Sequence, residues 1–62
     1  MGYYILKKST STVQDQKYYF VLKASNGEII ATSEMYSTKQ AAQTGIRSVQ
    51  QNGSSDDIRD ET

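Results

Sequence analysis

The fold is decided by residues 17–33, KYYFVLKASNGEIIATS. The first half of this stretch is rich in aromatic and aliphatic residues that favour strands. Because successive side chains of a strand point to opposite faces, one face carries Tyr18, Phe20, Leu22 and Ala24, and the other carries Tyr19, Val21 and Lys23. Asn26-Gly27 then gives the strongest short-range hairpin signal in the chain, and residues 28–33 return as the second strand. An antiparallel hairpin is therefore expected at the centre of the molecule.

Outside the hairpin, the sequence predicts one more strand and a helix. Residues 3–8, YYILKK, favour a strand, and the polar residues 9–16 connect it to the hairpin. The helix is expected to be capped by Ser37, with Gln40 completing a capping box and Tyr36 packing on the first turn. Its apolar stripe and its end are given by Ala42, Gly45, Ile46, Val49 and the pair Asn52-Gly53.

These elements predict an α+β fold, a three-stranded antiparallel sheet followed by one helix packed on one face (β-β-β-α). Residues 1–53 are expected to form this single domain. Residues 54–62 are expected to form an acidic, mobile tail, because Ile58 is their only large apolar residue. Gly45 lies in mid-helix, where its small size is expected to let the helix backbone approach Phe20 closely.

The turn leaves two registers open, and they differ in which isoleucine lies under the helix. A two-residue Asn26-Gly27 turn places Ile29 there. A three-residue Ser25-Asn26-Gly27 loop with a glycine bulge shifts the pairing by one residue and places Ile30 there. The isoleucine left over faces away from the helix and joins an uncovered apolar patch, whose candidate members are Tyr19, Val21 and Ile30.

Composition narrows the possible functions. The 62 residues include no cysteine and no histidine, which removes disulfides, thiolate metal sites and the commonest general acid–base group. We therefore predict no enzyme, no catalytic residue, no metal and no cofactor. The first ten residues lack the apolar run of a signal peptide, and no stretch approaches the length of a membrane span. A cytoplasmic protein is expected.

Residues 18–53 also carry a spaced pattern: Phe20-x-Leu22-x-Ala24, Asn26-Gly27, Ser33-Glu34-Met35-Tyr36, Gly45-Ile46, Ser48-Val49 and Asn52. This pattern resembles the YegP-like family of small uncharacterised proteins. The resemblance implies a β-β-β-α unit that occurs either singly or as a tandem pair in one chain. It implies no activity, because none is established for the family. The connection at residues 9–16 is longer than the family's usual short turn.

The polar cluster before the helix allows a functional and a structural interpretation. The functional one is an anion site on the free N–H groups of the helix start, for which Glu34 has the wrong charge. The structural one, which we favour, makes Ser37 the cap and places Glu34 near the positive end of the helix dipole. With the turn, the candidate structural motif comprises Asn26, Gly27, Glu34, Tyr36, Ser37 and Gly45.

The predicted function is association rather than catalysis. A domain of this size buries little surface and usually needs a disulfide, a metal or a partner chain. We therefore expect a non-enzymatic domain that forms a homodimer through the patch of Tyr19, Val21 and Ile30. The alternative is a weak single-stranded nucleic-acid-binding module, although the net charge of zero argues against it. In that module lysines would bind phosphates and aromatics would stack on bases, and the candidates are Tyr3, Tyr4, Tyr18, Tyr19, Phe20, Lys7, Lys8, Lys17 and Lys23. The sequence predicts no membrane partner and identifies no small-molecule ligand.

Overall fold

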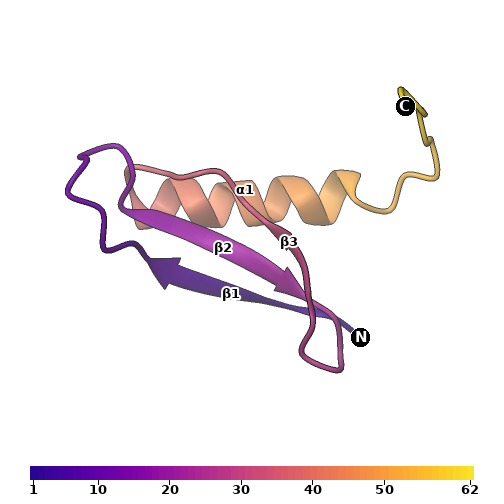
Figure 1. Cartoon of the computed structure of the whole chain (residues 1–62), viewed down its shortest axis with the longest axis horizontal. Coiled ribbons are helices and arrows are strands. Elements are labelled where there is room, and N and C mark those ends of the chain that lie inside the picture. Colours follow the sequence, from indigo (N-terminus) through magenta and orange to yellow (C-terminus); the bar gives the residue numbers. More distant parts are fainter.

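The computed structural model describes all 62 residues as a three-stranded sheet and one helix (Figure 1). The elements are β1 (Tyr3–Lys8), β2 (Tyr18–Lys23), β3 (Ile29–Thr32) and α1 (Lys39–Asn52). The strands are antiparallel and lie in the order β1-β2-β3, so β2 is central. The predicted α+β fold and its order of elements are confirmed. α1 is too short and too polar to cross a lipid bilayer.

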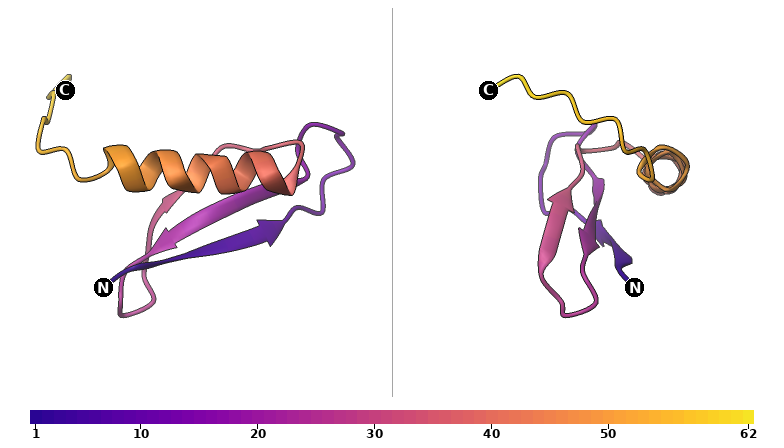
Figure 2. Two further views of the ribbon diagram at one scale, coloured as in Figure 1. Left: turned by 180° about the vertical axis from the view of Figure 1, so that it is seen from behind. Right: turned by 90° about the vertical axis from the view of Figure 1, so that its right-hand side faces the viewer.

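The helix covers one face of the sheet, and covers it unevenly. α1 lies over β2 and β1 and leaves β3 uncovered, which the end-on view shows directly (Figure 2). Three residues are buried, namely Phe20, Val21 and Ala42. Phe20 is the centre of the helix-side core: the ring of Tyr4 meets it edge-on and the ring of Tyr36 stacks on it, both with ring centres 6.1 Å away. The core is therefore small and lies under one half of the sheet.

The hairpin between β2 and β3 contains both of the registers left open by the sequence. Next to the turn, the N–H of Ala24 donates to the carbonyl of Glu28 (2.8 Å), which closes a three-residue loop. Gly27 adopts the left-handed conformation there (φ 91°), which glycine adopts without strain. One residue further on, a bulge at Ile30 shifts the pairing. The remainder of β3 therefore follows the register of the two-residue turn.

The position predicted for the isoleucines is wrong. Neither lies under the helix, since Ile29 and Ile30 are 61% and 62% exposed. The physical reason is the register: next to the turn Ile29 lies opposite Lys23, on the face away from α1, and the bulge leaves Ile30 out of the pairing, so that Ala31 and not an isoleucine lies opposite Leu22. β3 is an edge strand of the sheet and carries these two exposed isoleucines.

The predicted helix cap is also wrong by one residue. Thr38, not Ser37, is the N-cap: its backbone is extended, and its hydroxyl accepts a hydrogen bond from the N–H of Ala41 (3.0 Å). Tyr36 pairs with Tyr18 on β2 through two backbone hydrogen bonds of 2.7 and 2.9 Å. Because Tyr36 is still paired with β2, the chain leaves the sheet over Ser37 and Thr38, and α1 begins only at Lys39. The capping box of Ser37 and Gln40 is therefore not formed.

The helix ends at Asn52, as the Asn52-Gly53 pair predicts, and residues 54–62 contain no helix or strand. In Figure 1 this tail runs beyond the end of α1 and away from the sheet. Ile58 is 88% exposed. Within the tail, Arg59 pairs with Asp57 at 3.1 Å. The hydroxyl and N–H of Thr62 donate to the carboxylate of Asp60, which lowers the pKa of that carboxyl below its usual value.

Candidate functional site

The sheet face opposite α1, together with the edge of β3, is the candidate functional surface. Phe20 packs against the helix-side residues Tyr36 and Gly45, so alternation along β2 turns Tyr19, Val21 and Lys23 to the opposite face. Residues paired across a sheet share a face, which adds the partners of these three on β1 and β3. We call this the open surface; its apolar members are Tyr3, Ile5, Tyr19, Val21, Ile29 and the bulged Ile30.

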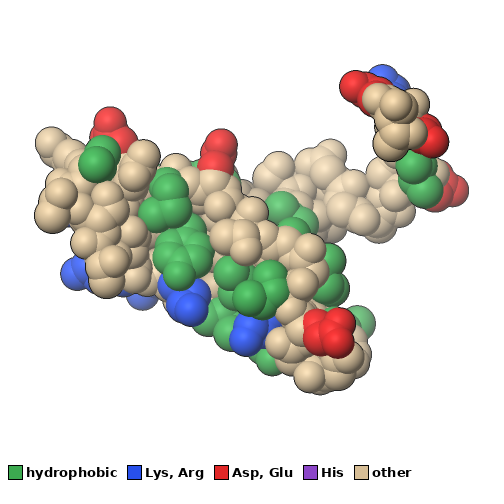
Figure 3. All heavy atoms as spheres, viewed as in Figure 1, with side chains coloured by type: hydrophobic (Ala, Val, Ile, Leu, Met, Phe, Trp, Pro, Cys, Tyr) green, Lys and Arg blue, Asp and Glu red, His purple; other side chains and the backbone are tan.

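The open surface shows its apolar character most strongly along β3. Figure 3 views the molecule from this side and shows hydrophobic side chains gathered over the strands, with lysines among them. Tyr3 is 43% exposed, and the two isoleucines of β3 are each more than half exposed. No strand or helix lies on the outer side of β3. Its outward backbone groups are therefore free to pair with another chain.

The three residues predicted for self-association differ in their exposure. Ile30 is exposed and Tyr19 is partly exposed, but Val21 is only 5% exposed, so the prediction that it presents an uncovered surface is wrong. Val21 does face away from the helix. It is buried because β2 is the central strand, with Ile5 opposite on β1 and Thr32 opposite on β3. The accessible residues of the predicted patch are therefore those at its rim, Ile30 and, in part, Tyr19.

The aromatic residues considered for nucleic-acid binding are divided between the two faces. Phe20 is buried, and Tyr4 packs edge-on against it on the helix side. Tyr18 pairs with Lys8 and shares that face. On the open surface only Tyr3 and Tyr19 remain, where the ammonium of Lys7 lies 6.0 Å from the ring centre of Tyr19. The structure does not bring the predicted set together.

The polar cluster before the helix has a structural explanation, and Ser33 is central to it. The N–H of Ser33 donates to the carbonyl of Phe20 (2.9 Å), and the N–H of Phe20 donates in return to the Ser33 hydroxyl (2.9 Å) rather than to a backbone carbonyl. The same hydroxyl donates to the carbonyl of Glu34 (2.7 Å). Ser33 thus completes the strand pairing while Glu34 and Met35 bulge out, and Tyr36 returns to pair with β2. The sequence predicts Ser37 as the residue whose hydroxyl caps the helix, whereas Ser33 and Thr38 carry the hydrogen bonds.

The other residues of the structural motif also lie where backbone geometry depends on them. A Cβ atom at Gly45 would meet the hydroxyl of Tyr36, and would lie 2.8 Å from Cζ of that ring and 3.1 Å from Cε2 of Phe20. In the turn, Oδ1 of Asn26 accepts a hydrogen bond from the N–H of Glu28 (3.1 Å). Glu34 is exposed, and its carboxylate makes no ion pair.

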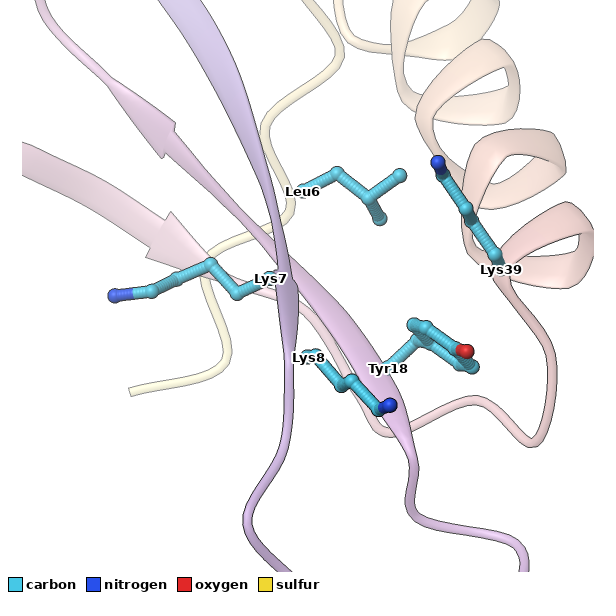
Figure 4. A pocket seen from close by; sticks show the side chains of 5 residues that line it. All are labelled: Leu6, Lys7, Lys8, Tyr18 and Lys39. Carbon is cyan, nitrogen blue, oxygen red and sulfur yellow. The ribbon is translucent and has the colours of Figure 1, made fainter.

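A shallow hollow of about 270 Å³ lies on the helix side, between β1, β2 and the start of α1 (Figure 4). Leu6, Lys8, Tyr18 and Lys39 surround it with their side chains. Lys7 also borders the hollow, but its side chain points away, to the opposite face of the sheet. No acidic residue lines the hollow. Elsewhere, no group of three or more histidine, cysteine, aspartate or glutamate side chains is placed to hold a metal ion.

Comparison with known proteins gives one family. The family model described as "Domain of unknown function (DUF1508)" matches residues 14–60. A UPF0339 protein of Photorhabdus laumondii is 60% identical over 52 residues, which are 84% of this chain and 42% of that protein. A UPF0339 protein of Acinetobacter baylyi is 61% identical over 49 residues, 79% of this chain and 43% of that protein.

The UPF0339 protein YegP of Escherichia coli is 49% identical over 51 residues, 82% of this chain and 46% of that protein. The resemblance to the YegP-like family is thereby confirmed. The chain spans less than half the length of these curated relatives. No solved structure matches it.

Proposed function

The chain belongs to the DUF1508 family, and we propose that it acts by binding a second copy of itself through the open surface. The observation that carries the proposal is the exposed edge strand β3, whose isoleucines Ile29 and Ile30 are 61% and 62% exposed beside free backbone groups. An uncovered apolar edge of this kind is a template for pairing with another strand. The proposed role is association rather than catalysis.

The charge distribution supports β3 rather than β1 as the edge that pairs. β1 ends in Lys7 and Lys8, and lysines on an edge strand oppose pairing between identical chains. β3, with the sequence IIAT, carries no charge. In a two-fold dimer the same element meets itself, so like charges at the edge would face one another. The uncharged edge avoids that repulsion.

A stable dimer needs more contact area than the edge strand β3 offers, so the proposed contact includes the adjoining face of the sheet. A standard interface buries about 800 Å² on each partner, roughly a sixth of the accessible surface of 5114 Å². The four residues of β3 are too few to supply this area by themselves. The half-exposed Tyr3 and the neighbouring Tyr19 and Ile5 extend the apolar area across the open surface.

The length of the relatives also supports the proposal. The matched region makes up 42–46% of the Photorhabdus, Acinetobacter and Escherichia proteins, which leaves room in each for a second unit of this size. Two such units in one chain could meet through their open surfaces without a second molecule. A single unit reaches the same arrangement by pairing with another copy.

The test measures mass in solution by light scattering at micromolar concentrations, where a dimer has twice the chain mass of 6.9 kDa. Ile30→Lys is expected to give the monomer mass with an unchanged circular dichroism spectrum, because the side chain is already more than half exposed. Val13→Lys is the matched control, since Val13 is 53% exposed in the loop between β1 and β2. A monomeric wild type, or a dimer unaffected by Ile30→Lys, would contradict the proposal.

A second candidate function, weak binding of single-stranded nucleic acid, keeps one supporting observation. Lys7 and Tyr19 are neighbours on the open surface, and Lys23 and Tyr3 are paired there. Cations beside exposed aromatic rings can bind phosphates and stack on bases. Titration with mixed-sequence RNA at low and high salt tests this function: binding lost in high salt and in Tyr19→Ala would support it, and no binding at low salt would rule it out.

A further inference from the structure

The hollow beside the start of α1 has a chemical character that the association proposal does not use. We propose that it binds a small phosphate monoester with an apolar body. Its lining combines two cationic side chains, Lys8 and Lys39, with an aliphatic one, Leu6, and a phenol, Tyr18 (Figure 4). These side chains come from β1, β2 and α1, so only the folded chain brings them together.

Both cations of the hollow lack a partner within the chain. The single ion pair of the structure joins Arg59 and Asp57 in the tail. The first turn of α1 contains no acidic residue, and no carboxylate lines the hollow. Lys8 and Lys39 therefore produce a local positive potential, which an anionic ligand lowers. The two ammonium groups lie at opposite ends of the hollow (Figure 4), so the phosphate of a ligand pairs directly with one of them and is attracted by the other over a longer distance. A phosphate monoester is mostly a dianion at neutral pH, so this potential attracts it more strongly than it attracts a carboxylate.

The remaining walls favour an organic ligand over a bare ion. Leu6 and Tyr18 are partly buried and lie on the helix side, since they pair with Phe20 and Lys8 respectively. An aliphatic side chain and an aromatic ring next to each other offer apolar contact to a ligand, and the phenol adds a hydrogen-bond donor. The volume of about 270 Å³ lies just below the range of drug-sized pockets. It suits a small molecule rather than a polymer.

The hollow and the open surface lie on opposite faces of the sheet. Lys8 shares its face with Tyr18, whereas the side chain of Lys7 points to the open surface (Figure 4). Ligand binding is therefore independent of the proposed dimer, and failure of one proposal leaves the other standing. The arrangement also supplies a matched control, because Lys7 and Lys8 are adjacent exposed lysines on the same strand with side chains on opposite faces.

The experiment is an amide NMR titration of the full chain with phenyl phosphate, with inorganic phosphate as the comparison ligand. The titration is carried out at an ionic strength of about 0.15 M, because attraction between charges more than about 8 Å apart is then largely screened. Phenyl phosphate is expected to shift the amides of Leu6, Lys8, Tyr18 and Lys39 together and to bind more tightly than inorganic phosphate. Lys8→Gln and Lys39→Gln are each expected to weaken binding about two- to fivefold, as for exposed charge pairs.

Lys7→Gln removes the same charge from the neighbouring position and is expected to leave the affinity unchanged. The spectra without ligand show in each case whether the variant is folded. The proposal is overturned if Lys7→Gln weakens binding as much as Lys8→Gln, if the shifts spread over all lysines, or if inorganic phosphate binds as tightly as phenyl phosphate. The first two results indicate nonspecific attraction by surface charge, and the third removes the role of the apolar walls.

Discussion

Replacing Gly45 by alanine gives the sharpest prediction about stability, because the added Cβ atom has two opposing effects. It improves helix propensity, and it overlaps with the side chain of Tyr36. In a helix interior, alanine is more favourable than glycine by about 1 kcal/mol. At Gly45 the added Cβ would overlap with the hydroxyl of Tyr36 and lie 2.8 Å from its Cζ and 3.1 Å from Cε2 of Phe20. Tyr36 cannot move aside freely, because its ring stacks on Phe20 and its backbone is bonded to Tyr18.

Overpacking of this kind typically costs about 1–3 kcal/mol, so Gly45→Ala is expected to destabilise the chain by a net amount of about 1 kcal/mol. For a domain of this size that loss lowers the melting temperature by roughly 4–8 °C. The measurement is thermal unfolding followed by circular dichroism at one fixed protein concentration. Thr44→Ala, at an exposed helical position, is the control and is expected to stabilise by a few tenths of a kcal/mol.

A double variant separates the steric effect from helix propensity. Tyr36→Phe removes the atom closest to the added Cβ, and the Tyr36 hydroxyl makes no side-chain hydrogen bond that would be lost. Gly45→Ala should therefore cost less in the Tyr36→Phe background, with a coupling energy above about 0.5 kcal/mol. A Gly45→Ala chain that melts higher than the wild type would refute the packing argument, since propensity alone would then account for the change.

Two further predictions concern the hydroxyls of Ser33 and Thr38, which accept hydrogen bonds from backbone N–H groups in place of backbone carbonyls. Ser33→Ala leaves the N–H of Phe20 without its acceptor and should lower the free energy of unfolding by about 1–3 kcal/mol. Hydrogen exchange at the Phe20 amide should become faster. Unchanged exchange would show that water or a backbone carbonyl accepts from this N–H instead. Thr38→Ala removes the acceptor for the N–H of Ala41 and should cost about 1 kcal/mol, whereas Ser37→Ala should have almost no effect on the melting temperature. The reverse order would place the cap at Ser37.

The elements of the fold could be predicted because each has a local signal. Alternation in residues 17–24 and the Asn26-Gly27 turn give β2 and the hairpin, and the apolar stripe gives α1. The two bulges could not be predicted in the same way. The bulge at Ile30 arises where the register set by the turn meets the register of the rest of β3, and the bulge at Glu34 depends on a hydroxyl satisfying an N–H thirteen residues away.

The surfaces were less predictable than the fold, for a related reason. A strand pattern tells which side chains share a face, but not where across the sheet a helix lies. The bulge in β3 determines that Ile29 and Ile30 are exposed, and the displacement of α1 toward β1 brings Lys39 to the same hollow as Lys8. The burial of Val21 could have been predicted from the sequence, because a residue of a central strand has neighbouring strands on both sides, whichever face its side chain occupies.

The burial of Val21 also decides how the proposed dimer is to be tested. A lysine at Val21 would place an ammonium among Ile5 and Thr32 without a partner, which costs several kcal/mol and endangers the fold itself. Loss of a dimer in such a variant would then follow equally from unfolding. Ile30 lies at the rim, where a lysine can extend into solvent in the monomer. A folded monomer produced by Ile30→Lys, from a wild type that is a dimer, would therefore be attributed to the proposed interface, because Ile30 is exposed and does not belong to the core.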